Sequence, residues 1–260
     1  MLAHFIDSKP FQCGYFNDRH SLFEEYLLED LSEVEFEYLL SHGMRHFGEY
    51  FFRPNCGTCQ ACVPIRVRSF DFKPNRSQKR AVDACRDIEM KVGPPRYSMK
   101  KFQLYLDHKT RFKSLQDDVE DIQNFKLSFY GKSPFGIEFE YYLGGELVGA
   151  ALADVTRKTF SAIYTFYQPE LVARMPIGNF SVIKQIEFSR NRGIPFTYLG
   201  YYINKNASLA YKANFRPCEL YIDHEWRPFR NGEGDFLIPE NRIYWQNTDT
   251  LVKATSRPGI

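Results

Sequence analysis

Apolar residues recur along the chain with two different periods, which predicts a mixture of strands and helices. Val63 to Phe72 alternates apolar side chains with polar ones, the pattern of a half-buried strand, and its polar positions include arginines. Residues 137–143 and 146–155 are two further runs joined by Gly144-Gly145, which predicts a β-hairpin. Asn179 to Asn191 has the longer period of an amphipathic helix.

Helix starts are indicated by two capping boxes, Ser21-x-x-Glu24 and Ser32-x-x-Glu35, and the second helix is expected to end at Gly43. The other expected elements are helices over 77–86, 98–112 and 119–130, strands over 44–52, 159–167 and 195–203, and a helical turn over 207–212.

Gly93-Pro94-Pro95 is the best internal boundary, because two prolines stop a preceding element and stiffen the joint. We therefore expect an N-terminal α/β domain over residues 1–95 and a mixed-sheet domain over residues 96–260, an α+β chain overall. A meander followed by a helix and a strand is also the order of acetyltransferase-like (GNAT) domains. Residues 174–180, RMPIGNF, lack the second glycine of the loop that binds pyrophosphate in those domains.

Composition is that of an ordinary globular protein of 260 residues, with 43% hydrophobic residues, 25% charged residues and a net charge of +2. The N-terminus lacks the basic and apolar regions of a signal peptide, and no apolar run approaches the ~18–20 residues of a membrane span. These features predict a cytoplasmic protein that binds no membrane.

Three cysteines are spaced as Cys56-x-x-Cys59-x-x-Cys62, a spacing that lets a tight loop direct neighbouring thiolates at one ion. Zinc sites and iron–sulfur clusters usually need four ligands, and Cys13 is the best fourth candidate. The alternative is a set of free thiols on a rigid loop. The cofactor that the sequence indicates is therefore a structural zinc ion or an Fe–S cluster bound by these cysteines.

A basic ribbon surrounds this loop and follows it in sequence, and it predicts binding to a polyanion. The alternative is an ordinary solvated face. The ribbon comprises Arg53, Arg66, Arg68, Lys73, Arg76, Lys79 and Arg80, against the single acid Asp71.

The C-terminal half holds a chemically rich strand and turn, with Tyr198, Gly200 and Tyr201 followed by Tyr211 and Lys212. Glycine at a strand end permits the close approach of a substrate backbone or a small acyl group. The tyrosines supply hydroxyls and the lysine a cation, although tyrosines on a strand are more often core and rim residues.

Two further polar residues lie in apolar surroundings. Asp154 sits among alanines on the second hairpin strand, so its carboxylate is expected to have a specific partner. Gln185 lies on the amphipathic helix.

Several blocks of this sequence together resemble the arginyl-tRNA–protein transferase family, in particular its bacterial aspartate/glutamate leucyltransferase branch. The resemblance spans residues 11–82 and 137–217. It is carried by Cys13-Gly-Tyr15, HGMRHFGEYFFRPNCGTCQACVPIRVRSFDFKPNRSQKRAV, LVGAALADV, SAIYTFYQPE and IGNFSVIKQIEFSRNRGIPFTYLGYYINKNASLAYKANFRP.

The resemblance implies an enzyme that moves leucine, or alternatively arginine, from a charged tRNA to the N-terminal amine of proteins that begin with Asp or Glu. The product would be an N-terminus read by the degradation machinery. The resemblance also implies a GNAT-like C-terminal domain that needs no cofactor for its chemistry.

Aminolysis of an aminoacyl ester requires a proton acceptor for the amine and hydrogen-bond donors for the developing oxyanion. We assign the first role to Asp154, directly or through water, and the second to Tyr201 or Gln185. Tyr211 and Lys212 would hold the tRNA acceptor end. Arg66, Arg76 and Arg80 would receive the acidic N-terminal residue, tRNA phosphates, or both.

Two readings from other classes compete with this one. They are a non-enzymatic RNA-binding protein with a zinc knuckle and a coenzyme A-dependent N-acetyltransferase. The expected partners of the transferase are an aminoacyl-tRNA and the acceptor protein, and the chain is expected to act as a monomer.

Overall fold

The computed structural model describes residues 1–111 and 121–244 and confirms an α+β fold. Two compact units divide the chain. The first unit comprises Met1–Arg66 and Tyr198–Ile260, and the second comprises Val67–Thr197. The predicted boundary at Gly93-Pro94-Pro95 falls inside the second unit. Within the described ranges, no helix combines the length and apolarity needed to cross a bilayer.

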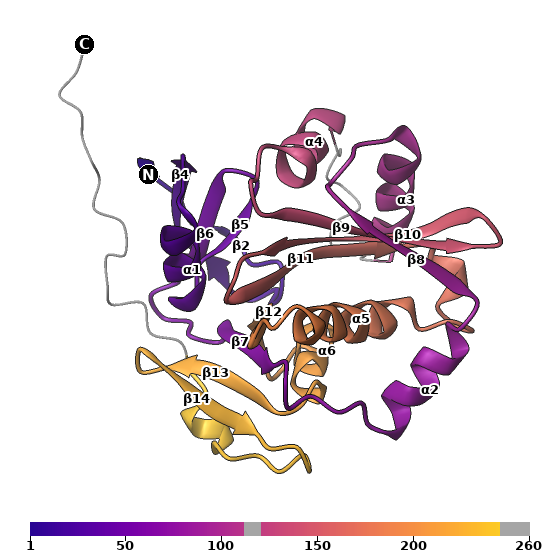
Figure 1. Ribbon diagram of the computed structural model, residues 1–260. Helices are drawn as coiled ribbons and strands as arrows, with labels where there is room; N and C mark the ends of the chain where they lie inside the picture. Colours follow the sequence, from indigo (N-terminus) through magenta and orange to yellow (C-terminus); the bar gives the residue numbers. More distant parts are fainter. Residues whose placement is uncertain (112–120, 245–260) are drawn as a thin grey trace. The chain divides into compact units, whose positions relative to one another are not determined.

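The second unit contains four antiparallel strands in the order β11-β10-β9-β8 (Figure 1). These strands are β8 (Ile88–Gly93), β9 (Gly136–Leu143), β10 (Glu146–Val155) and β11 (Thr159–Tyr167). Its helices are α2 (Arg76–Ala84), α3 (Met99–Lys109), α4 (Ile122–Tyr130) and α5 (Ile177–Asn191), with the short helix η2 (Pro169–Leu171) before α5.

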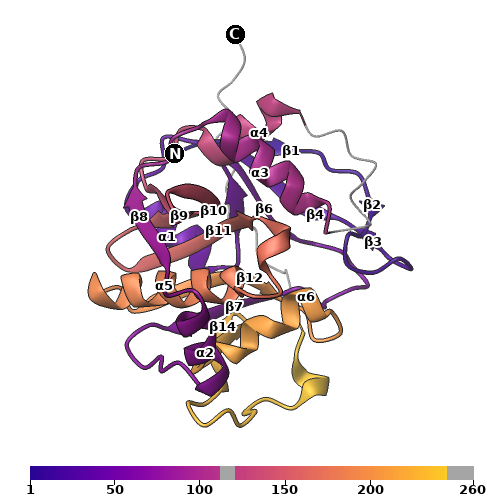
Figure 2. The ribbon, with the colours of Figure 1, turned by 90° about the vertical axis from the view of Figure 1, so that its right-hand side faces the viewer.

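Alternate residues of β10 enter two separate cores, one on each face of these strands. Leu152 packs with Leu104 of α3 and Phe125 of α4. Ala153, the next residue, packs with Ile177 of α5 in the other core. Helices α3 and α4 therefore cover one face and α5 covers the opposite face, as both views of the ribbon show (Figures 1 and 2).

The first unit contains two groups of strands. One has the order β1-β4-β6-β5 and is accompanied by α1 (Glu33–Ser41), and the other has the order β14-β13-β7-β12. The strands of the first group are β1 (Leu2–Ile6), β4 (Phe23–Glu29), β5 (Arg45–Phe47) and β6 (Tyr50–Pro54). Those of the second are β7 (Val63–Arg68), β12 (Phe196–Tyr202), β13 (Cys218–Ile222) and β14 (Glu225–Arg230). Strands β7 and β12 carry the chain across the unit boundaries.

Short elements complete the first unit and place its polar residues. They are the paired strands β2 (Phe11–Gln12) and β3 (His20–Ser21), and the helical turns α6 (Ala207–Ala210), η3 (Tyr211–Asn214) and η4 (Glu240–Arg242). The side chain of Asn206 caps α6 by accepting a 3.0 Å hydrogen bond from the Ser208 amide. This cap fixes the start of α6, which leads directly into η3 and Lys212.

Several predicted elements are confirmed. The hairpin turns at Gly144-Gly145, the third strand of the meander ends where expected, and Ser32 and Glu35 form the predicted capping box. The order hairpin, strand, helix, strand is present in β9, β10, β11, α5 and β12. Phe112 and residues 119–120, the predicted ends of two helices, lie outside the described residues.

Two local predictions are wrong, and three strands were missed. Ser21-x-x-Glu24 does not start a helix; Phe23–Glu29 is strand β4, and Glu24 instead accepts a hydrogen bond from Arg53. The single strand expected over 44–52 is the hairpin of β5 and β6. Strands β8, β13 and β14 were not predicted, because their short apolar runs carry no long periodic signal.

Candidate functional site

The predicted site residues fall into two groups, one in each unit. The first unit holds Cys13, Cys56, Cys59, Cys62, Arg66, Tyr198, Gly200, Tyr201, Tyr211 and Lys212. The second unit holds Arg76, Arg80, Asp154 and Gln185.

Gly200 lies beneath two cationic side chains of the first unit. Its φ of +86° is a conformation that side-chain-bearing residues avoid. A Cβ atom at this position would lie 3.4 Å from Lys212 Nζ and 3.8 Å from Arg45 Nε. The missing side chain therefore leaves the strand backbone close to both cations.

Lys212 is held by the backbone of the same strand. Its Nζ donates a 3.0 Å hydrogen bond to the Tyr201 carbonyl oxygen. Burial, followed by the positive charge of Arg45, lowers the pKa of Lys212 to about 7, and Cys62 opposes this shift. Lysine amines with a lowered pKa are concentrated at functional sites.

Tyr201, the predicted oxyanion donor, is buried and already bonded. Its hydroxyl lies 3.0 Å from the Gly43 carbonyl oxygen and 3.4 Å from that of Phe52. Burial raises the pKa of Tyr201 well above its ordinary value. Because a phenol has one proton, donation to a substrate would require these contacts to break.

Arg66 is enclosed by side chains of the first unit. Its Nε and Nη2 each lie 2.7 Å from Glu219 Oε2, and its Nη1 donates to the Tyr198 hydroxyl at 3.2 Å. Its guanidinium carbon lies 4.3 Å from the centre of the Trp226 ring. Arg66 and Tyr198 are thus parts of one internal clamp, in which a protein carboxylate already occupies the guanidinium.

Arg53, at the start of the basic ribbon, is in the same situation. Its side chain is 3% exposed, and its Nε donates to Glu24 Oε2 at 2.6 Å. Arg68, by contrast, is exposed and pairs with Asp71 at 2.7 Å. The ribbon is therefore divided, with its first two arginines committed to internal carboxylates.

The sulfurs of the cysteine loop contact polar groups of the first unit. Arg19 Nη1 donates to Cys59 Sγ at 3.1 Å, and the Sγ of Cys56 lies 3.4 Å from the Leu22 carbonyl oxygen. Burial, with smaller effects from the neighbouring thiols, raises the pKa of Cys62 to about 12.

In residues 1–111 and 121–244, no three or more His, Cys, Asp or Glu side chains are grouped as ligands for a metal ion. In this arrangement, two of the four predicted ligand sulfurs contact a guanidinium and a backbone carbonyl. A metal at Cys13, Cys56, Cys59 and Cys62 stays a prediction.

A cavity of about 760 Å³ adjoins the cysteine loop. It is bordered by the β3 strand and by the loop itself, so Cys56 and Cys59 face open space. Its lining residues are Pro10, Asp18, Arg19, His20, Ser21, Leu22, Asn55, Cys56, Gly57, Thr58 and Cys59.

Asp154 lies on β10 of the second unit and is 1% exposed. One of its carboxylate oxygens accepts a 2.8 Å hydrogen bond from the Ser133 hydroxyl, which confirms the expected specific partner. The same partner gives Asp154 a structural role, so a test of its catalytic role must separate the two.

Gln185 belongs to a buried row of polar side chains along one face of α5. Ser181, Gln185 and Ser189 are each four positions apart, so they lie on the same side of the helix. Gln185 Nε2 and the Tyr141 hydroxyl both donate to Ser181 Oγ at 2.8 Å. Gln185 Oε1 is buried and has no hydrogen-bond partner among the described residues.

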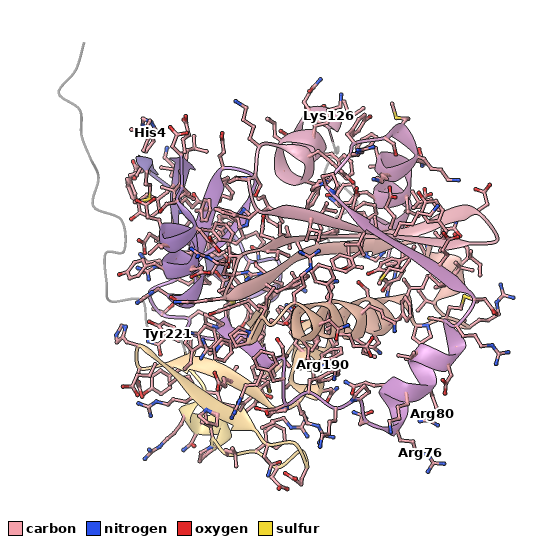
Figure 3. All side chains as sticks on the ribbon, viewed as in Figure 1. His4, Arg76, Arg80, Lys126, Arg190 and Tyr221 are labelled. Atoms are coloured by element: carbon pink, nitrogen blue, oxygen red, sulfur yellow. The ribbon has the colours of Figure 1, made fainter. Side chains whose placement is uncertain are left out.

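An exposed basic surface lies on and before helix α2 of the second unit. It comprises Lys73, Arg76, Lys79 and Arg80, all of which are exposed. Arg76 and Arg80 project from α2 away from the strands (Figure 3). Asn75 caps this helix by accepting a 2.9 Å hydrogen bond from the Gln78 amide, which fixes the start of the helix that carries three of the four cations.

Sequence reasoning missed three residues of the first unit: Arg45, Glu24 and Glu219. Arg45 is 8% exposed and is the first residue of the short strand β5. A charged residue within the aromatic-rich run of residues 44–52, which was expected to be a strand, is a usable signal, since such side chains are rarely buried without a partner. The two glutamates give no local signal, because their arginines are distant in sequence.

Two protein-family models match the chain, one for each half of a known enzyme. The model described as the N terminus of arginine-tRNA-protein transferase matches residues 11–80, and the model of its C terminus matches residues 100–222. Both sequence blocks on which the resemblance depends overlap these ranges.

Individual relatives match over nearly the same length. Aspartate/glutamate leucyltransferase of Marinobacter nauticus is 32% identical and covers 86% of this chain and 94% of its own. The enzyme of that name from Stenotrophomonas maltophilia is also 32% identical, covering 84% of this chain and 90% of its own. Among solved structures, FemX is similar with a TM-score of 0.43 and 11% identity, over 71% of this chain and 64% of that one.

Proposed function

Since this chain belongs to the arginine-tRNA-protein transferase family and is an aminoacyltransferase, we propose that it transfers leucine from leucyl-tRNA to proteins that begin with Asp or Glu. The observation that supports this most strongly is the match to leucyltransferases over more than four-fifths of the chain. The product carries an N-terminal leucine that marks it for degradation. The enzyme acts in the cytoplasm, as a monomer.

The reaction forms an amide and breaks an ester. The α-amine nitrogen of the acceptor attacks the ester carbonyl carbon, the C–N bond forms, and the bond to the tRNA ribose oxygen breaks. The amine loses a proton, and the departing ribose oxygen gains one. An α-amine with a pKa near ~8 is partly neutral at cellular pH, so positioning supplies much of the acceleration, up to roughly 7–11 kcal/mol.

Three side chains are proposed to accept the amine proton or to donate a hydrogen bond to the oxyanion. Asp154 accepts the amine proton, and Tyr201 or Gln185 donates to the oxyanion. The amide Nε2 of Gln185 would have to leave Ser181 Oγ to donate to the oxyanion, whereas its buried, unpartnered Oε1 is suited to accept from a donor group of the substrate. The exposed position of Tyr211, at the start of η3, supports its contact with the tRNA acceptor end.

A transfer assay with purified protein tests the proposal. Labelled leucyl-tRNA, arginyl-tRNA and acetyl-coenzyme A are each offered with peptides that begin with Asp, Glu or Asn. We expect leucine to appear on the Asp and Glu peptides. Transfer of arginine would show that arginyl-tRNA, and not leucyl-tRNA, is the donor. Transfer of an acetyl group would establish an acetyltransferase, and RNA binding without any transfer would establish the non-enzymatic alternative.

The proton-acceptor role of Asp154 is tested by Asp154→Asn, which keeps the side-chain shape. We expect transfer to fall more than tenfold at an unchanged melting temperature. Ser133→Ala is the control, since it removes the 2.8 Å hydrogen bond but keeps the carboxylate. A variant that keeps more than about a tenth of the rate would contradict the assignment, because a tenfold change is only ~1.4 kcal/mol.

The basic surface on α2 is proposed to contact tRNA phosphates, since its four cations are exposed and lie within one short segment. Replacing Arg76, Lys79 and Arg80 together by alanine is expected to weaken tRNA binding. It is also expected to reduce the slope of the logarithm of the binding constant against the logarithm of the salt concentration by about one for each lost contact. Lys132→Ala is the control, an exposed cation outside this surface. Equal salt slopes for the triple variant and the wild type would reject the surface.

A further inference from the structure

The cavity of about 760 Å³ beside the cysteine loop has the size of pockets that bind small ligands. It lies wholly in the first unit, since all of its lining residues belong to Met1–Arg66. Most of the lining residues are exposed or half-buried, and Ser21 alone is buried. The side chains proposed above for the chemistry and for tRNA phosphates do not line this cavity, so its role is still to be assigned.

Arg19 brings unused hydrogen-bond donors to the cavity. Its Nη1 donates to Cys59 Sγ at 3.1 Å, and its guanidinium carbon lies 4.3 Å from the centre of the Phe16 ring. Its one ion pair with a described residue is with Asp18, whose carboxylate lies 3.8 Å from Nε, too far for a hydrogen bond. A guanidinium has five N–H donors, so Nε and Nη2 can still bind a ligand.

The pairing of Arg19 differs from that of the buried arginines of the same unit. Arg53 and Arg66 are held at 2.6 and 2.7 Å by carboxylates that are themselves largely buried. Asp18, in contrast, is 80% exposed, and exposed ion pairs contribute little stability. A carboxylate of a ligand can therefore take the place of Asp18 at little cost.

Ser21 adds an unsatisfied hydroxyl to the same cavity. It is 5% exposed, and its hydroxyl forms no hydrogen bond with any residue in 1–111 or 121–244. Buried polar groups normally have a partner, so a buried hydroxyl that lines a cavity indicates a polar ligand. The hydroxyl can donate one proton to an oxygen of that ligand.

We propose that Arg19 and Ser21 bind, in this cavity, the side-chain carboxylate of the N-terminal Asp or Glu of the acceptor protein. A guanidinium presents parallel N–H groups that match the two oxygens of one carboxylate, and the serine hydroxyl supplies a further donor. The inference rests on the proposed transfer to acidic N-termini, and it names the residues that select them.

A single carboxylate fits this cavity better than an RNA backbone does. RNA carries a negative charge on every nucleotide and is held by several cations together. Arg19 is the only arginine or lysine in the lining, and Asp18 would repel the neighbouring phosphates. One acidic side chain needs only one guanidinium, while the exposed cations on and before α2 suit the RNA.

The sequence-based candidates for this role are less suited to it. Glu219 accepts from two nitrogens of Arg66, so a substrate carboxylate would have to displace an internal one. Arg76 and Arg80 are exposed and project from α2 away from the strands (Figure 3). Arg19 combines free donors with a cavity.

The experiment measures binding of two fluorescent peptides that differ only in beginning with Asp or Asn. Wild-type protein is expected to prefer the Asp peptide by about 10- to 100-fold, the effect of charge-assisted hydrogen bonds. Arg19→Met is expected to remove most of this preference, and Arg19→Lys to keep part of it. Arg227→Met is the matched control, because Arg227 is 46% exposed, pairs with Asp223 at 3.1 Å and lies in the same unit outside the lining.

Two further variants make the test independent of a loss of folding. Ser21→Ala is expected to lower the preference for the Asp peptide severalfold, because it removes one donor. Asp18→Asn is expected to raise the affinity for the Asp peptide, because it removes the carboxylate that competes for Arg19. A general loss of structure cannot raise the affinity, so this change of opposite sign identifies a direct effect.

Binding of the peptides requires no charged tRNA and is therefore measured separately from transfer. If the wild type selects the Asp peptide through Arg19 but transfers nothing, the proposed function fails and the carboxylate site stands. Equal affinities of the wild type for the two peptides, or a wild-type preference in folded Arg19→Met, would overturn the inference whatever the transfer assay shows. A higher Kd for tRNA in Arg19→Met, with the peptide preference unchanged, would assign this arginine to RNA and also overturn it.

Discussion

Replacing Lys101 by methionine is expected to lower the free energy of unfolding by about 3–5 kcal/mol, because the change leaves a buried carboxylate without its partner. Lys101 and Glu138 are each 3% exposed and lie 2.6 Å apart. Lys101 Nζ also donates to Glu140 at 2.7 Å and to the Arg96 carbonyl at 2.7 Å. All three of its protons are therefore used, inside the second unit.

The adjacent residue provides the control for this prediction. Lys100 is also a lysine on α3, but its side chain is 54% exposed, and its partner Glu146 is 73% exposed. Lys100→Met is expected to unfold close to the wild-type temperature, since exposed ion pairs contribute little. Thermal unfolding of both variants decides the matter. Equal melting temperatures would show that the buried pair does not stabilise the unit.

Replacing Gly200 by alanine is expected to reduce transfer at least tenfold and to lower stability by about 1–2 kcal/mol. The stability loss follows from the φ of +86°, which a Cβ atom disfavours. The loss of transfer follows from the position of that Cβ, 3.4 Å from Lys212 Nζ, where the added carbon would narrow the space beside a lysine of the candidate site.

Gly193→Ala separates the two effects. Gly193 also has a positive φ, +73°, but a Cβ there would meet no atom within 4 Å. This control is expected to lose similar stability and to keep its activity. Transfer kinetics and thermal unfolding of both variants are the required measurements. If both variants lose transfer in proportion to stability, Gly200 has only a conformational role.

The parts of the fold that were predictable from sequence are those in which neighbouring residues determine the outcome. The hairpin of β9 and β10 follows from two apolar runs around Gly144-Gly145. Ser32 and Glu35 form their capping box because the two residues satisfy each other's backbone amides. In these places local chemistry and the tertiary structure agree.

The wrong prediction at Ser21-x-x-Glu24 shows where local signals fail. The same capping motif occurs, but Glu24 is used by Arg53, and Tyr26 and Leu28 are buried in a strand. A tertiary ion pair and strand packing thus override a helix-capping motif. No local pattern contains that information.

The candidate site was predictable only in part, for the same reason. Gly200 and Lys212 were selected from one block of sequence, and the structure brings them together. Arg45 comes from a distant strand, so its position beside Lys212 depends on the pairing of elements far apart in the chain. The commitment of Arg66 to Glu219 likewise depends on tertiary structure, which is why an available arginine and an occupied one look identical in sequence.

The first unit is assembled from two stretches of chain with the whole second unit inserted between them. On the ribosome, residues 1–66 therefore emerge long before the strands that complete their unit. Arg66 is synthesised 153 residues before its partner Glu219. Residues 67–197, by contrast, contain all the elements of their own unit, so the middle of the chain can complete its folding before the beginning does. A translation stop near residue 197 would yield one complete unit and one exposed, unfinished amino-terminal segment.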